Sequence, residues 1–321
     1  MASRSWASCS AAEIVPNLLA HYGIQVVATR AVSRAVRPQW LLVGCVLPDL
    51  PWILARAVAA TGRLHDPYTL KLYTTVQGSL VGCLLLAGAL ALVAAAPRAV
   101  FLLLASSALV HLCLDACQTS WGDGVHLFAP VSWEHLNLAL FWPGRPVSLL
   151  LTGFGLLALL WLWPRRLPWN ALLARPSTSR LLGAAALVAA YTLAPFAFLN
   201  GPEAADNYSL GTLREVSSRP GRPIELERVR YVERDGRGFA RTFAGEELRI
   251  AGGGLGGPGT LSLRATFVDE TTIAVRESHR HPPWFRDASS YLGLLALVVF
   301  WAVPKRGVGS HTKKRRHGAR P

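Results

Sequence analysis

Acidic and histidine side chains are few in the apolar part of this chain, and their clustering is typical of a metal site. Outside residues 200–287 there are only six acidic residues: Glu13, Asp49, Asp66, Asp115, Asp123 and Glu134. Five histidines share the same half of the sequence: His21, His65, His111, His126 and His135. Ionisable groups in an apolar setting usually face a protein interior and pair with one another. Carboxylate oxygens and imidazole nitrogens are also ligands of zinc and other divalent ions.

The most specific pattern is His111-Leu-Cys-Leu-Asp115. A spacing of i,i+4 places the imidazole and the carboxylate on one face of a helix. The two side chains could ligate one metal ion, or the carboxylate could orient the imidazole from behind. The structural alternative is a His–Asp pair that only ties two helices together.

Asp49 lies in Leu47-Pro-Asp-Leu-Pro51, where two prolines interrupt a helix beside a carboxylate. Prolines free backbone carbonyls, and non-helical backbone at membrane depth is tolerated mainly where it lines a cavity. Asp49 is therefore a second candidate ligand, and the alternative is an aspartate that caps the helix break. His21, taken by itself, is typical of a hydrogen-bonded core histidine.

Two loops carry auxiliary candidates. His65 and Asp66 precede an apolar segment and have the character of loop surface. Asp123 and His126 lie on the Gly-rich connector 119–130, which is either a plain external loop or one that folds back on the bundle through its aromatic residues. We keep His65, Asp123 and His126 as auxiliary ligands and assign no catalytic residue.

The composition requires membrane helices to position these residues. Hydrophobic residues make up 51% of the 321-residue chain and charged residues only 16%, whereas soluble domains have about 25% charged residues. Apolar runs close to the length that spans a bilayer, roughly 20 residues, recur along the chain. We expect spans near 14–32, 39–59, 79–96, 99–117, 147–163, 180–198 and 288–303.

The distribution of charge gives the expected orientation. The net charge is +14, yet residues 200–287 hold 13 basic and 13 acidic residues, so the whole excess lies in the short loops and the C-terminal tail. Basic residues follow alternate spans, and the positive-inside rule then places the N-terminus outside, the C-terminus inside and residues 200–287 outside. We therefore expect a multi-pass protein of the cytoplasmic membrane, and the Ala, Leu, Arg and Gly bias is typical of a GC-rich bacterial genome.

Residues 200–287 have the pattern of a small all-β domain. Apolar and polar residues alternate over 223–232, and 247–250, 261–268 and 272–275 continue the alternation. Asp235-Gly236 and the glycine-rich run that follows supply turns. About five short strands predict an OB-like barrel or a sandwich. OB barrels often bind nucleic acid, but the zero net charge and the external position make nucleic acid an unfavoured partner.

The predicted organisation is a polytopic α-helical membrane protein, of about seven transmembrane helices, with an inserted extracytoplasmic β-rich domain. The membrane helical domain with the metal site covers residues 1–199, and the β-rich domain covers 200–287. A final transmembrane helix covers 288–303, and a basic cytoplasmic tail covers 304–321.

The order of these motifs resembles a known family. A histidine on the first helix precedes Pro-Asp at the end of the second, and a later helix ends in His-x-x-x-Asp before Ser-Trp-Gly and Leu-Phe-Ala-Pro. Over residues 14–165 the chain is similar to the membrane-bound metal-dependent hydrolases typified by the YdjM inner-membrane protein, relatives of zinc-dependent phospholipase C-like proteins. The resemblance implies that His21, Asp49, His111 and Asp115 hold one or two divalent ions, most simply zinc.

The chain departs from this family at the opening of the third helix. The family has a His-Arg…Thr-His-Ser motif there, whereas this chain reads Tyr73-Thr-Thr-Val-Gln-Gly-Ser-Leu80, with Gln77 and Gly78 in the place of Thr-His. Either His65 or His126 replaces the missing histidines, or the site binds metal without hydrolysing a substrate, or it is only structural.

The polar cluster and the resemblance together predict a membrane-bound metal-dependent hydrolase that acts on a phosphoester or ester. A membrane lipid is the natural substrate of a site near the outer leaflet. The external domain would dock substrate, another ligand or a protein partner. The alternative is a non-catalytic scaffold or sensor whose external domain binds a partner. A transporter of metal or protons ranks third. The expected orientation places these acids and histidines toward the outer side of the bilayer, which leaves no relay of ionisable groups across it.

Overall fold

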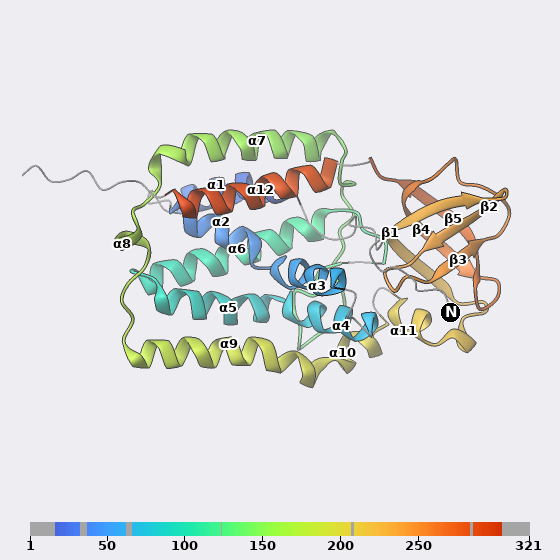
Figure 1. The fold of residues 1–321 in the computed structure, drawn as a ribbon, viewed down its shortest axis with the longest axis horizontal. Helices are drawn as coiled ribbons and strands as arrows, with labels where there is room; N and C mark the ends of the chain where they lie inside the picture. The colour runs from blue at the N-terminus through green and yellow to red at the C-terminus, as the bar shows by residue number, and fades with distance from the viewer. Residues whose placement is uncertain are drawn as a thin grey trace, which may run out of the picture.

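The computed structural model describes residues 17–32, 37–61, 66–122, 124–206, 209–282 and 285–303. The long helices lie side by side along the long axis of the molecule, and a β barrel stands at one end of the bundle (Figure 1). The fold therefore has two parts, a helical bundle and a separate barrel.

Three helices are long and apolar enough to cross a bilayer. They are α6 (Pro97–Cys117), α7 (Pro146–Leu162) with a short extension to Arg165, and α9 (Thr178–Phe198) continued by α10 (Asn200–Ala204). The 21 residues of α6 cover roughly 31 Å at about 1.5 Å per residue, which matches the hydrocarbon core of a bilayer. These helices associate the protein with a membrane.

Two further spans are broken. The helices α2 (Pro38–Val46) and α3 (Leu50–Ala60) meet at 61°, and α4 (Pro67–Gln77) and α5 (Leu80–Val93) meet at 66°. Counting each bent pair as one span gives up to five candidate spans. Both bends have local causes. Pro51 lies in the first turn of α3, where proline favours the start of a new helix. Ser79 caps α5, because its hydroxyl accepts from Gly82 N–H at 3.3 Å.

The seven spans expected from hydropathy are not confirmed. The helix α1 (Leu18–Val32) has 15 residues, and the apolar part of α12 (Phe285–Ala302) begins only at Ala288. Both are shorter than the roughly 20 residues that a span needs.

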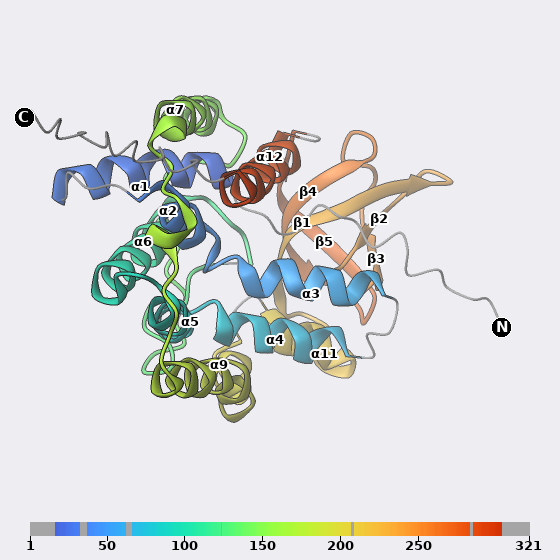
Figure 2. The same ribbon diagram turned by 60° about the vertical axis from the view of Figure 1, so that its left-hand side comes forward.

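Close helix contacts hold the bundle together. The helices α1, α7 and α12 lie on one side of it, and α5 and α9 lie on the other (Figures 1 and 2). Gly155 of α7 lies against the backbone of α1, where a Cβ atom would come within 1.7 Å of the Leu19 carbonyl oxygen. Small residues permit this approach, as is common between membrane helices.

The barrel is closed by five strands in the order β1-β2-β3-β5-β4. The strands are β1 (Pro223–Arg234), β2 (Arg237–Arg241), β3 (Glu247–Ile250), β4 (Gly259–Phe267) and β5 (Thr272–Arg280). All neighbours pair antiparallel except β3 and β5, which pair parallel. Inward-facing side chains such as Tyr231, Leu248 and Leu263 fill its core. The short helix α8 (Trp169–Leu172) lies between α7 and α9, and the short helix α11 (Leu210–Arg214) precedes β1.

The sequence left a barrel or a sandwich open for the alternating segments, and they form a closed barrel. Asp235 and Gly236 have φ angles of 52° and 70°, which suit the two-residue turn of a hairpin. The strand β2 was not among the predicted segments, because five residues reading Arg-Gly-Phe-Ala-Arg carry too little alternation to stand out.

The connector between α6 and α7, residues 118–145, packs against the barrel. The backbone N–H groups of Trp121 and Gly122 donate to Glu227 at 3.0 Å and Glu225 at 2.8 Å. Trp142 stacks on His279 of β5 with ring centroids 3.7 Å apart. These contacts are thus with the barrel and not, as the sequence suggested, with the bundle. The connector meets the bundle through its backbone, where Leu140 N–H donates to the Cys117 carbonyl at 2.9 Å.

Candidate metal centre

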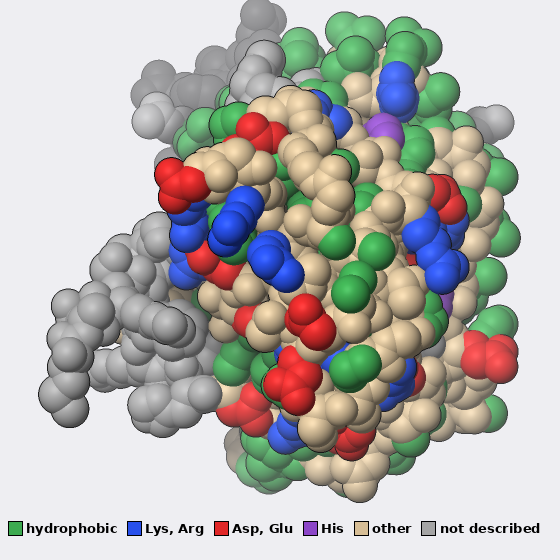
Figure 3. All heavy atoms as spheres, turned by 90° about the vertical axis from the view of Figure 1, so that its right-hand side faces the viewer, with side chains coloured by type: hydrophobic (Ala, Val, Ile, Leu, Met, Phe, Trp, Pro, Cys, Tyr) green, Lys and Arg blue, Asp and Glu red, His purple; other side chains and the backbone are tan. Residues whose placement is uncertain are grey.

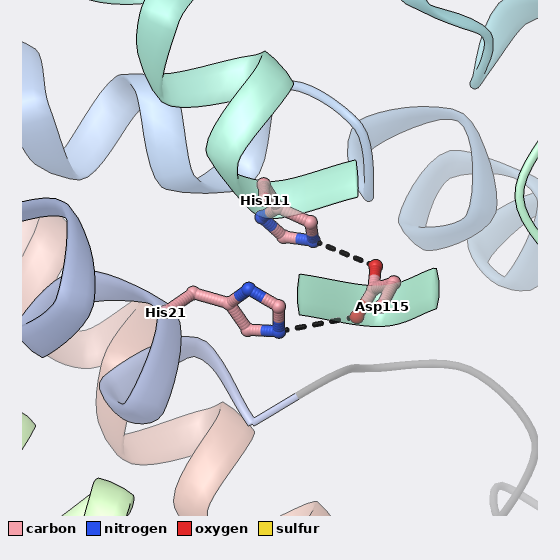
Figure 4. A group of neighbouring side chains, drawn as sticks. All are labelled: His21, His111 and Asp115. Atoms are coloured by element: carbon pink, nitrogen blue, oxygen red, sulfur yellow. Dashed lines mark ion pairs between the residues drawn. The ribbon is translucent and has the colours of Figure 1, made fainter. Parts of the chain in front are cut away.

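Four of the residues singled out from the sequence meet in the bundle. His111 and Asp115 lie one turn apart on α6, and His21 of α1 reaches the same carboxylate (Figure 4). Asp49 joins them from the bend between α2 and α3. Segments far apart in sequence thus bring two imidazoles and two carboxylates together.

The distances within the group are short. His21 Nε2 lies 3.2 Å from Asp115 Oδ1, and His111 Nε2 lies 3.1 Å from Asp115 Oδ2. His111 Nε2 is also 3.6 Å from Asp49 Oδ1. The two imidazole rings stack with centroids 3.9 Å apart. One ligand atom from each of His21, His111 and Asp115 can be chosen so that all lie within 4.8 Å of one another.

The donor set fits a divalent ion. Both ring nitrogens of His111, Nδ1 of His21 and Oδ2 of Asp49 are buried and have no hydrogen-bond partner among the described residues. Buried polar atoms normally have partners. The Nε2 atoms of both rings face Asp115 (Figure 4), so a cation beside that carboxylate would give His111 Nε2 a partner. Ligands at about 2.0–2.1 Å from a tetrahedral zinc ion lie roughly 3.3 Å apart, close to the 3.1 and 3.2 Å seen here.

A polar contact one turn away holds the two ligand helices in register. Gln25, four residues after His21, donates from Nε2 to the carbonyl of Ser107 at 3.1 Å, and Ser107 precedes His111 by four residues. The thiol of Cys45 donates to Gln25 Oε1 at 2.8 Å. The same faces of α1 and α6 therefore meet twice, once through this contact and once through the histidines.

A pocket opens beside the site. Asn17, His21 and Gln118 supply its polar wall, and its apolar wall includes Leu114, Phe141 and Leu151. The cavity has room for a water-sized ligand.

Asp115 links the ligand group to its surroundings. Its side chain is 22% exposed, whereas His111 is fully buried. Gln118 Nε2 donates to Asp115 Oδ1 at 2.9 Å and so fixes the carboxylate beside the pocket. Ligands could therefore reach the group through the side formed by Asp115 and His21.

Of the auxiliary candidates, only His126 lies in the part of the chain that the structure describes, and it does not join this group. His65 and Asp123 lie outside the described residues. His126 is buried in the connector, where its Nδ1 contacts the Trp133 carbonyl at 3.0 Å and its ring lies 6.5 Å from that of His135. His126 therefore has a structural role in folding the connector.

Gln77 occupies the place of the family's missing histidine motif and has a structural partner. Its Nε2 donates to the Tyr73 hydroxyl at 3.1 Å and to the Tyr191 carbonyl at 3.2 Å. These bonds tie the end of α4 to α9. The side chain is satisfied without a metal ion.

Gln25 and Gln118 were not predicted from the sequence. Gln118 follows Asp115 by three residues, a spacing that brings side chains together on a helix, and this spacing was the available signal. Gln25 repeats the position of His21 one turn on, but only the packing of α1 on α6 reveals its partner. Comparisons with family models, curated proteins and solved structures found no match to this chain.

Proposed function

We propose that the protein is a metal-dependent hydrolase of the cytoplasmic membrane, with its site toward the outer face and its barrel outside. The observation that carries this proposal is the convergence of His21, His111 and Asp115, whose ligand atoms lie within 4.8 Å of one another. The resemblance of residues 14–165 to the YdjM-like family points to the same ligands. The excess of basic residues in alternate loops supports the orientation.

The residues of the site have separate roles in this proposal. His21, His111 and Asp115 would hold the ion, and zinc suits a set of imidazole and carboxylate ligands. Such an ion supplies Lewis acidity toward a phosphoryl or acyl oxygen and activates water. Asp49, whose Oδ1 lies 3.6 Å from Nε2 of His111, would be a further ligand, and Gln118 would orient Asp115 from 2.9 Å.

The substrate class follows from the surroundings of the site. The pocket beside His21 combines polar Asn17 and Gln118 with apolar Leu114 and Leu151. The cavity itself has room for a water molecule, so a polar ester group on an apolar chain would approach the site along these residues. His111 lies six residues before the end of α6, roughly 9 Å along the helix axis, so the site would lie at the depth of lipid ester groups.

A non-catalytic scaffold or sensor is the second candidate. Gln77 favours it, because this side chain replaces the family's histidine motif and bonds only to protein groups in α4 and α9. In that case the His–Asp contacts would serve to join α1, the α2–α3 bend and α6.

Hydrolysis of a phospholipid by the full-length protein distinguishes the two. We expect the zinc-loaded protein in detergent micelles to release headgroup or fatty acid, and we expect a chelator to stop the release until zinc is restored. His111→Ala should abolish turnover. His135→Ala, at an exposed histidine of the connector, should retain it.

Equal turnover by the wild type and His111→Ala would contradict the hydrolase. The scaffold predicts no turnover at all, together with a lower midpoint of thermal unfolding in His111→Ala, because a buried interhelical contact is lost.

A further inference from the structure

One outer face of the barrel is rich in arginine. Eight outward-facing positions on β1, β2 and β3 hold five arginines, one glutamate and two apolar residues. We call this surface the arginine face; it consists of Arg230, Val232, Arg234, Arg237, Phe239, Arg241, Glu247 and Arg249. The whole segment 200–287 has no net charge, so positive charge is concentrated on this face.

The strand register places these side chains next to one another. Arg230 is directly opposite Arg241, and Arg234 is directly opposite Arg237. Phe239 lies between Val232 and Arg249 in the neighbouring row. Like charges directly opposite on a sheet destabilise it. Two such pairs on one small face are a cost to folding that binding of an anion would offset.

Only part of this charge is neutralised within the face. Glu247 bonds to Arg234 at 2.5 Å. The Arg234 guanidinium also lies 5.2 Å from the centre of the Phe239 ring. Glu247 is also directly opposite Arg241. Five guanidinium groups and one carboxylate leave the face with a formal net charge of +4 (5 − 1). Figure 3 looks onto the barrel end and shows basic side chains gathered there with acidic ones beside them.

The arginine face is distant from the membrane side of the barrel. Strand β1 meets the connector at Glu225, and Arg230 and Arg234 are roughly 17 and 30 Å further along the strand at about 3.3 Å per residue. Both distances exceed the ~8 Å over which salt screens a charge in physiological solution. The face therefore lies away from the connector, and we look for its partner among soluble anions.

We propose that the arginine face binds an acidic polysaccharide. Guanidinium groups bind carboxylates and phosphates through paired hydrogen bonds, and arginines in successive rows suit a chain with a charge on each sugar. In five-stranded OB barrels, the face of the second and third strands binds oligonucleotides and oligosaccharides. Single-stranded nucleic acid binds through several stacking aromatic rings, whereas this face has one ring, Phe239, and the Arg234 guanidinium lies over it. The charged sugar chain is therefore the partner that the face fits.

Binding of polygalacturonate, a polymer of sugar carboxylates, tests this proposal. Full-length protein in nanodiscs of uncharged lipid would be immobilised, and polygalacturonate, neutral dextran and a single-stranded oligonucleotide would be passed over it. We expect polygalacturonate to bind, dextran not to bind, and the oligonucleotide to bind more weakly. Arg230→Ser/Arg249→Ser should weaken polygalacturonate binding about tenfold or more.

A matched variant separates this face from general charge. Arg276→Ser removes an exposed arginine of β5 that lies outside the arginine face, and it should change the affinity less than twofold. Thermal unfolding should show that Arg230→Ser/Arg249→Ser is folded. The proposal is overturned if polygalacturonate does not bind, if the oligonucleotide binds more tightly, or if Arg276→Ser weakens binding as much as the double variant. The result does not depend on metal in the bundle, so it is separate from the hydrolase test.

Discussion

The two imidazoles of the candidate centre stack face to face, and each directs Nε2 to a different oxygen of the Asp115 carboxylate. Each Nε2 atom is either an N–H group that donates to this carboxylate or, without its proton, a ligand for a metal ion held beside it. Asp49 adds a second carboxylate at 3.6 Å from His111. A divalent cation bound to Nε2 of both rings and to the carboxylates would take the place of the two N–H protons.

Asp49→Asn should weaken metal binding without abolishing it. The amide keeps the shape of the side chain but loses the negative charge beside the ion, while the other three ligands remain, so the affinity should fall roughly 10- to 100-fold. Competition with a chelator of known affinity measures the change. Asp235→Asn, at the barrel turn, is the control, and equal affinities for the wild type and Asp49→Asn would contradict the assigned role.

At the scale of single helices, close approach of α1 and α7 places His21. Gly155 of α7 lies directly beneath the Leu19 carbonyl, two residues from His21. Gly153, on the same helix, has nothing within 4 Å of the position of a Cβ atom. The two glycines lie two residues apart on the same helix and differ in what an added methyl group would contact.

Gly155→Ala should destabilise the protein, and Gly153→Ala should not. The new methyl would lie 1.7 Å from the Leu19 oxygen, and relieving that overlap requires a shift of backbone costing about 1–3 kcal/mol. Thermal unfolding in detergent measures both variants. Gly153→Ala should keep or slightly raise the midpoint, because alanine favours a helix over glycine by up to about 1 kcal/mol. A midpoint unchanged in Gly155→Ala would show that α1 and α7 do not pack this closely.

Sequence spacing correctly predicted features that lie within a single helix or strand. The i,i+4 pair His111 and Asp115 lies on one face of α6, and the alternating segments became strands of a barrel. The approach of His21 and Asp49 to that pair depends on packing between distant segments, which spacing does not encode, and it was expected only from the family resemblance. The break that bends α2 and α3 by 61° was predicted from its two prolines. The 66° bend was missed, because α4 is more polar than α5 and was not part of a predicted span.

At the scale of the whole molecule, the connector joins the candidate centre to the barrel. It begins three residues after Asp115 with Gln118, which bonds to that carboxylate. It then reaches β1 through Trp121 and Gly122 and β5 through Trp142. A change in the position of the barrel would therefore move backbone that lies within a few residues of Asp115.

Docking of the barrel should weaken in mild acid. Burial, followed by the positive charges of Arg145 and Arg228, lowers the pKa of His279 below its usual range. Because the undocked imidazole protonates near pH 6.5, its stabilising contribution is present above about that pH and is lost as pH falls toward the lower pKa of the docked state.

Tryptophan fluorescence during thermal unfolding, recorded between mildly alkaline and mildly acidic pH, measures this effect. His279→Gln cannot protonate, so its midpoint should fall less with acid than that of the wild type. The same pH dependence in both proteins would show that His279 does not control docking.

The metal content of the purified full-length protein tests the candidate centre most directly. The wild type should contain a stoichiometric divalent ion, most simply zinc, and His111→Ala/Asp115→Ala should contain none, while His135→Ala should retain it. Absence of bound metal from the wild type after growth and purification with added zinc would contradict the metal centre and leave the two histidines as a helix contact.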